Sequence, residues 1–250
     1  MSAARRHGAG AGPASGVAAT AAHDAPAAAP PPIAEGQVHV WWFDLSDAPD
    51  PAAAPPPSAV DEAERAARMA SPSERVAFLR HRARLRSTLA AYLPEAAATS
   101  LACEVAQGGR PWAPALRRRG LAFSSGRRGA VGVVAVACGI DVGVDVEVRR
   151  PDLPFSRIAD EVLDASDRAR IARAADPEAA FFEAWTHHEA RVKLWGLGLA
   201  EAAARRARGE GVPPAYVVQT LAAPPGYAAA LAASREPARV TVLGGRTPSV

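Results

Sequence analysis

Residues 185–199 read WTHHEARVKLWGLGL, a stretch in which charged residues lie inside a strongly helical, aromatic-rich pattern. At about 100° per residue its apolar positions fall on one stripe, which predicts an amphipathic helix packed against a core. Gly196 and Gly198 suit a helix C-terminus followed by a tight turn. The stripe consists of Phe181, Trp185, His188, Val192, Trp195 and Leu199.

Glu189 and Lys193 lie four residues apart on one flank of this stripe, so they are neighbours on the helix surface. One interpretation is a surface ion pair, which is common and contributes only about 0.2–0.5 kcal/mol. The other is that the pair belongs to a functional site. A second acidic stretch is needed to choose between them.

GVDVE at residues 143–147 places Asp145 and Glu147 two apart among valines. Because the side-chain period of a strand is two, both carboxylates share one face of a sheet. Neighbouring carboxylates repel each other unless a cation relieves them, and Mg²⁺ takes one or two carboxylates together with waters and phosphate oxygens. Ordinary alternation on the solvent side of a strand is the other explanation, and Asp141 could belong to the same face.

The composition limits the class of protein. The chain has 250 residues, of which 49% are hydrophobic, and a net charge of +3. This charge excludes a polybasic nucleic-acid binder, and no apolar run reaches the roughly 20 residues of a membrane span. Cys103 and Cys138 lack metal-binding spacing and indicate reduced thiols in a cytoplasmic protein rather than a disulfide.

The order of the patterns predicts an α+β fold. Residues 1–36 are rich in Ala, Gly and Pro and predict a disordered tail, followed by an N-terminal half at 37–139, a C-terminal half at 140–244 and a loose tail at 245–250. Strands are expected at 38–45, 101–106, 121–125, within 130–148 and at 238–243, with a hairpin formed by 215–221 and 226–233. Helices are expected at 61–69, 71–93, 158–175 and from 177 into the quoted stretch.

The helix expected at 71–93 is rich in arginine. A solvated surface is the simplest interpretation, but some of these side chains could face an anionic ligand if the helix borders a cleft. The arginines are Arg75, Arg80, Arg82, Arg84 and Arg86.

A D-x-E after a glycine, followed about forty residues later by W-x-x-x-E-A-x-x-K-x-x-G-x-G-L, resembles the 4′-phosphopantetheinyl transferases of the surfactin-synthetase-activating type. GRPW at 109–112 is similar to the family's G-K/R-P segment, and LAFSS at 121–125 to its F-N-x-S-H-S strand. The resemblance covers residues 37–244. It implies two similar halves, each a small, mainly antiparallel sheet packed with helices, with the active site at their junction.

The resemblance also implies an activity and a partner. Such enzymes transfer the phosphopantetheine arm of coenzyme A to a serine of an acyl or peptidyl carrier protein in polyketide or nonribosomal peptide biosynthesis. By this resemblance Asp145, Glu147 and Glu189 surround a Mg²⁺ ion, or Mn²⁺, that bridges the coenzyme A pyrophosphate. Glu189 is the expected general base, and Lys193 the cation that stabilises the phosphates and the leaving group.

Contacts to coenzyme A phosphates are implied for Arg110 and Ser124, and for Arg75 or Arg82 if the register of their helix allows it.

The chain departs from the family at three places. Ser125 stands where the family has a histidine, for which Arg127 or Arg128 could substitute. Ala77 stands where an arginine is expected. His188 precedes Glu189 where many members have lysine, and its place on the apolar stripe predicts a packed, hydrogen-bonded core histidine outside the site.

The sequence thus predicts a monomeric, Mg²⁺-dependent carrier-protein activating transferase, with no nucleic-acid or membrane partner. The missing histidine and arginine suggest one alternative, a degenerate relative that binds coenzyme A or a carrier protein without catalysis. A more remote alternative is a protein without a site, in which the carboxylates are merely exposed.

Overall fold

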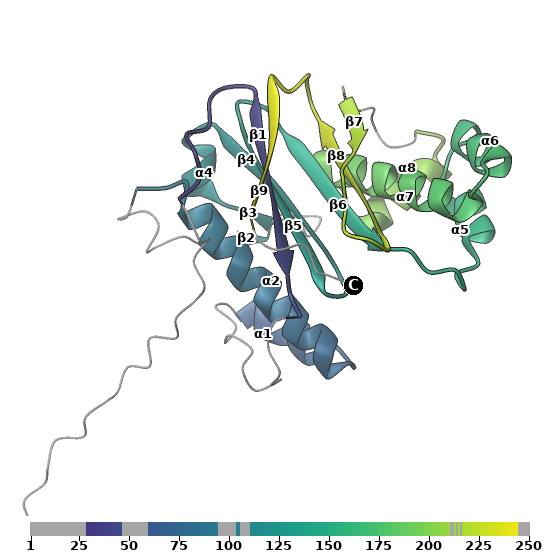
Figure 1. Ribbon diagram of the computed structural model, residues 1–250, viewed down its shortest axis with the longest axis horizontal. Coiled ribbons are helices and arrows are strands. Elements are labelled where there is room, and N and C mark those ends of the chain that lie inside the picture. The colour runs from purple at the N-terminus through teal and green to yellow at the C-terminus, as the bar shows by residue number, and fades with distance from the viewer. Residues whose placement is uncertain are drawn as a thin grey trace, which may run out of the picture.

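The structure is a computed structural model that describes residues 29–46, 60–94, 104–105, 111–210, 213, 215 and 217–244. The described residues form a mixed α+β fold with two main sheets between helices, which agrees with the α+β class expected from the sequence (Figure 1). The loose tail expected at 245–250 and most of the tail expected at 1–36 lie outside the described residues. Near the end of that tail, Ile33 packs on the core and Glu35 pairs with Arg235 at 2.8 Å.

The first sheet has the strand order β4-β5-β1-β9. Its strands are β1 (Gln37–Asp44), β4 (Leu121–Arg128), β5 (Val131–Cys138) and β9 (Arg239–Gly244). β5 pairs antiparallel with both β1 and β4, whereas β9 runs parallel to β1. The last strand of the chain, which the sequence assigns to the C-terminal half, therefore joins the sheet of the N-terminal half.

The second sheet is antiparallel, with the order β6-β8-β7. It contains β6 (Val142–Val148), β7 (Val217–Thr220) and β8 (Tyr227–Ala233). The hairpin predicted from residues 215–221 and 226–233 is confirmed as β7 and β8. The apolar run at 130–148 divides into β5 and β6 at Gly139, whose φ of 67° is in the left-handed region that glycine enters at little cost.

Alternating valines and alanines form the core between the two sheets. From β6 the inward side chains are Val142, Val144 and Val146, which meet valines of β1 and β5 and alanines of β8. Because successive strand residues point to opposite faces, Gly143, Asp145 and Glu147 lie on the other face of β6. The spacing of GVDVE thus places both carboxylates on the side of the sheet that faces away from the first sheet.

Two long helices cover the outer faces of the sheets. α2 (Pro72–Ala90) packs on the first sheet through Leu85 and Leu89, and α7 (Pro177–Leu194) packs on the second through Ala190 and Leu194 (Figure 1). Ser71 caps α2 by accepting a hydrogen bond from the Glu74 N–H, as the predicted helix start requires. The layers are therefore helix, sheet, sheet and helix.

The remaining elements are short. They are α1 (Val60–Ala67), β2 (Glu104–Val105), β3 (Pro111–Trp112), α4 (Pro114–Arg117), α5 (Phe155–Val162), α6 (Ala165–Arg173) and α8 (Leu199–Ala207). Of the strand expected at 101–106, residues 104–105 are described and extended. No helix among the described residues is long and apolar enough to cross a membrane.

The single helix expected at 158–175 is wrong, because the chain forms two helices there. Leu163 and Asp164 have extended backbones with ψ of 155° and 171°, which end α5 and start α6. The Asp164 carboxylate accepts a hydrogen bond from the Asp167 N–H at 2.9 Å. This N-cap satisfies a backbone donor that a continuous helix would have paired internally.

Candidate functional site

The site begins where α7 crosses β6 at Gly143. A Cβ on Gly143 would overlap the carbonyl oxygen of Ala190 and the backbone nitrogen of Leu194. The absence of a side chain therefore lets the helix backbone lie directly on the strand. Ala190 and Leu194 each follow one of the two candidate residues of α7, so this close approach brings Glu189 and Lys193 to the carboxylates of β6.

Lys193 pairs with Asp145 rather than with Glu189. The Lys193 ammonium lies 2.7 Å from Asp145 Oδ1 and donates to the Ser125 carbonyl oxygen at 3.2 Å. Asp145 is 6% exposed, so the ion pair is largely withdrawn from water. The interpretation of Glu189 and Lys193 as a surface ion pair is therefore wrong, because the lysine bonds to a strand and Glu189 is buried.

Two carboxylate oxygens in the site are buried without a hydrogen-bond partner, Asp145 Oδ2 and Glu189 Oε1. Burial, the largest cause, and the charges of Asp145 and Glu147 raise the pKa of Glu189 from 4.5 to about 7, although Lys193 opposes the shift. A buried, unpaired acceptor is costly. Such a carboxylate is a candidate to receive a cation or a proton.

Glu147 lies at the more open end of the cluster. Its carboxylate is 3.1 Å from the Arg128 guanidinium at the end of β4. Burial raises the pKa of Glu147, and so does the charge of Asp145, while Arg128 lowers it. Asp141, which could have shared this face, instead precedes β6 and pairs with Arg117 at 2.7 Å on the surface. The acidic cluster is therefore Asp145, Glu147 and Glu189.

The donor types of this cluster suit a hard divalent cation, and the two unpartnered oxygens are available as ligands. As the side chains stand, however, no three His, Cys, Asp or Glu residues in the described part of the chain are grouped so as to hold a metal ion. Lys193 and Arg128 occupy the acids instead. The observed arrangement is thus an ion-paired form of the cluster.

The serine strand β4 borders the acidic cluster. Ser124, predicted to contact a phosphate, is 6% exposed, and its Oγ accepts a hydrogen bond from the Val144 N–H at 3.0 Å. It therefore links the edges of the two sheets. Gly126 of the same strand contributes to the position of Lys193, which the sequence did not indicate. A Cβ at Gly126 would lie 3.2 Å from the Lys193 Nζ. The missing side chain leaves room for the ammonium.

The two described arginines that were predicted to bind phosphate, Arg75 and Arg82, have partners away from the acidic cluster. Arg82 is 8% exposed and bonds to Glu62 at 2.7 Å. Arg75 is exposed and donates to the Met69 carbonyl oxygen. Arg110 lies outside the described residues, and Ala77, at the position where the family has an arginine, is buried in the core. Of the two arginines considered as substitutes for the histidine, Arg128 reaches the cluster, whereas Arg127 pairs with Glu74.

Glu62 holds two arginines of α2 in a buried ion triad. Its carboxylate is 2.7 Å from Arg82 and 2.6 Å from Arg86, and Glu62 itself is 2% exposed. We expect Glu62→Ala to lower the free energy of unfolding by about 3 kcal/mol, because it leaves a buried guanidinium unpaired. Urea unfolding of the two proteins measures this, with Glu64→Ala as the control because Glu64 forms only an exposed pair with Arg68. Equal losses in both variants would contradict the triad's role.

Two histidines that were left outside the expected site have different surroundings in the structure. His188 is half-buried and lies beside Trp185, with ring centroids 6.4 Å apart, so it is not a core residue. His81 carried no functional prediction, but it is buried against Gly132, and burial and nearby cations, including Lys193, lower its pKa to about 3. At neutral pH it is therefore an uncharged ring beneath the site.

The stripe predicted for α7 is partly wrong. Phe181 and Val192 are buried, but Trp195 is 42% exposed and its indole N–H donates to the Pro213 carbonyl oxygen. The face that packs on the sheet instead contains Ala190 and Leu194. The glycine of β6 selects this face, because only small groups and backbone fit over it.

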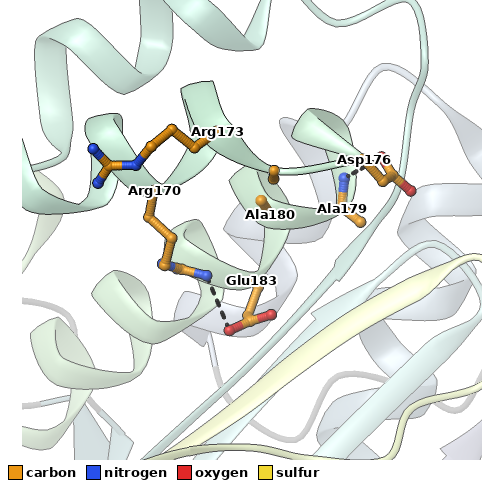
Figure 2. A pocket seen from close by; sticks show the side chains of 7 residues that line it. Arg170, Arg173, Asp176, Ala179, Ala180 and Glu183 are labelled. Carbon is orange, nitrogen blue, oxygen red and sulfur yellow. Dashed lines mark hydrogen bonds and ion pairs between the residues drawn. The ribbon is translucent and has the colours of Figure 1, made fainter.

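A separate hollow lies between α6 and the start of α7 (Figure 2). It is lined by Arg170, Arg173, Ala174, Asp176, Ala179, Ala180 and Glu183. Arg170 and Glu183 form an ion pair at 3.2 Å across it. Its lining contains neither the acids of β6 nor Lys193, so it is distinct from the acidic cluster.

Residues 141–208 match the sequence model of the 4′-phosphopantetheinyl transferase superfamily. This segment starts just before β6 and includes α7, so it holds all three acids and Lys193. The match supports a place for the chain in this superfamily and suggests phosphopantetheinyl transfer as its activity. No curated protein matches the chain.

Proposed function

We propose that the chain transfers the 4′-phosphopantetheine arm of coenzyme A to a serine of an apo acyl or peptidyl carrier protein, with 3′,5′-ADP as the second product. One observation carries the proposal. At the Gly143 crossing, Glu189 and Lys193 meet Asp145, and two buried carboxylate oxygens remain unpartnered. The superfamily match covers this crossing.

In the proposed reaction the serine hydroxyl oxygen forms a bond to the β-phosphorus of coenzyme A. The bond from this phosphorus to the bridging oxygen breaks, and its electron pair leaves with 3′,5′-ADP. Glu189 is assigned as the general base that accepts the serine proton. The Lys193 ammonium stabilises the negative charge that spreads over the phosphate oxygens.

Asp145, Glu147 and Glu189 would hold a Mg²⁺ ion at the junction of the two sheets. When bound, the ion would neutralise pyrophosphate charge. The unpartnered oxygens of Asp145 and Glu189 support this assignment. Mn²⁺ takes the same oxygen ligands and is expected to replace Mg²⁺.

We expect Glu147→Ala to reduce the rate of arm transfer at least about 100-fold. The reason is that the variant removes one carboxylate ligand and leaves Arg128 without its partner. Intact-mass spectrometry of the carrier protein over time measures the rate. Asp141→Ala is the matched control, because it removes a carboxylate outside the cluster. Equal rates in the two variants would remove Glu147 from the site.

A second candidate is a degenerate relative that binds coenzyme A without transferring the arm. It is favoured by the arginines of α2, because Arg82 is held by Glu62 and Ala77 replaces an expected arginine. Calorimetry with coenzyme A separates the two candidates when combined with the mass assay. Mg²⁺-dependent binding without transfer to several carriers would favour the degenerate relative, whereas turnover would exclude it.

A further inference from the structure

Each acid of β6 already has a cation of the protein as its partner. Lys193 of α7 lies 2.7 Å from Asp145, and Arg128 of β4 lies 3.1 Å from Glu147. Both cations keep access to solvent, since the Lys193 side chain is 28% exposed and that of Arg128 is 41% exposed. They can therefore turn away from the acids without unfolding the surrounding strands.

The charge of the cluster is only partly neutralised, and some of its oxygens lack hydrogen-bond partners. Three carboxylates share two cations, and Asp145 Oδ2 and Glu189 Oε1 have no partner although their residues are 6% and 9% exposed. Lys193 also donates a hydrogen bond to the Ser125 carbonyl oxygen, and the missing side chain of Gly126 leaves room for its ammonium group. These contacts keep the ammonium group on Asp145 until a stronger cation competes for Asp145 or a stronger anion competes for Lys193.

We propose that Lys193 and Arg128 are exchangeable counter-cations: they occupy the acids in the free protein, and they move to the pyrophosphate of coenzyme A when a divalent ion takes the acids. The inference rests on the proposed function and extends it. Its consequence is that Mg²⁺ and coenzyme A bind cooperatively, each weakly alone and more tightly together.

The physical reason is the balance of charge in a poorly solvated place. Mg²⁺ alone must displace an ammonium from a buried carboxylate and then leave two cations close to it without anionic partners. Coenzyme A alone places its negatively charged phosphates beside carboxylates that are still ionised, and the like charges repel each other. When both bind, the acids pair with the ion, and Lys193 and Arg128 pair with phosphate oxygens. Thermodynamic linkage makes the effect of each ligand on the other equal.

Calorimetry on the full chain tests the exchange, with MgCl₂ titrated in the absence and presence of saturating coenzyme A. In the unmodified protein we expect coenzyme A to tighten Mg²⁺ binding at least about tenfold, a coupling of the usual size. Lys193→Met should bind Mg²⁺ alone at least about fivefold more tightly than the unmodified protein, because the competing ammonium is gone. The increase in Mg²⁺ affinity that coenzyme A causes should be smaller in Lys193→Met than in the unmodified protein.

Arg117→Met is the matched control, because Arg117 forms an ion pair of the same 2.7 Å length with Asp141 outside the cluster. It should leave both Mg²⁺ affinities unchanged. If Lys193→Met does not fold, Arg128→Gln applies the same test at Glu147. Unchanged or weaker Mg²⁺ binding by the folded variant, with the coupling of the unmodified protein, would overturn the exchange.

The outcomes also separate this inference from the proposed function. Tighter Mg²⁺ binding by Lys193→Met, without arm transfer by the unmodified protein, would retain the exchange of cations and remove the transferase. Arm transfer by the unmodified protein with no gain in the variant would do the reverse. Absence of Mg²⁺ binding in every protein, with and without coenzyme A, would overturn both.

Discussion

Gly143→Ala is expected to destabilise the protein by more than about 3 kcal/mol, or to prevent its recovery as a folded chain. The added methyl group would overlap backbone atoms of Ala190 and Leu194, which cannot move without lifting α7 from the sheet. This exceeds ordinary overpacking, in which side chains shift and the cost is about 1–3 kcal/mol. Urea unfolding followed by circular dichroism measures the change in free energy.

The control for this variant is Gly226→Ala in the turn before β8. Gly226 has a φ of 76°, but a Cβ there would meet nothing within 4 Å. The control therefore loses only the free energy that a non-glycine residue needs to adopt the left-handed backbone, about 1–2 kcal/mol. A Gly143→Ala protein as stable as this control would show that α7 does not lie on β6 as described, and the site would lose its basis.

Glu189→Gln is expected to lower the rate of arm transfer by at least about 100-fold. The amide cannot accept the serine proton, and general bases contribute about 10²–10⁴-fold. Gln has nearly the same shape as Glu, so packing on the buried face of α7 should be unchanged. The mass assay measures the rate, and retention of more than a tenth of the activity would exclude Glu189 as the base.

The same variant should be more stable than the unmodified protein at alkaline pH without metal. The folded-state pKa of Glu189 is about 7, above its ordinary 4.5, so ionisation disfavours the folded state. The stabilising contribution of the protonated acid is present below pH 4.5 and is lost as the pH rises through 7. At about 1.4 kcal/mol per pKa unit, the rise from 4.5 to about 7 corresponds to a total loss of about 3.5 kcal/mol.

The difference in unfolding free energy between the two proteins at pH 5 and pH 8 isolates this effect, since the other acids titrate in both. Glu189→Gln should gain relative to the unmodified protein between these values. A constant difference would show that the Glu189 carboxyl is not perturbed in the folded protein.

Much of the site follows from spacing alone. A period of two places Asp145 and Glu147 on one face, and a helical period places Glu189 and Lys193 on one flank. Sequence could not show that Lys193 bonds to Asp145, because that contact depends on how α7 crosses β6. The crossing is set by Gly143, and no local pattern shows that this glycine lies under Ala190 and Leu194, which are 47 and 51 positions further along the chain.

The error in the apolar stripe of α7 has the same origin. Large aromatic side chains dominate a hydrophobic pattern, so they suggested that Trp195 faces the core. The helix instead packs through Ala190. Gly143 in the strand has no side chain, so the helix backbone can lie directly on it, and a large aromatic side chain at this position would prevent that contact. Likewise, no local pattern shows that β9 returns to β1, since strand pairing across most of the chain is decided by tertiary contacts.

The most direct test of the account is the mass of an apo carrier protein after incubation with the full chain and coenzyme A. One portion contains Mg²⁺, and a second contains a chelator instead. We predict the addition of a single phosphopantetheine arm to the carrier serine in the first portion and none in the second. No addition in either portion across several acyl and peptidyl carriers, or equal addition in both, would contradict the proposed metal-dependent transfer at the acidic cluster.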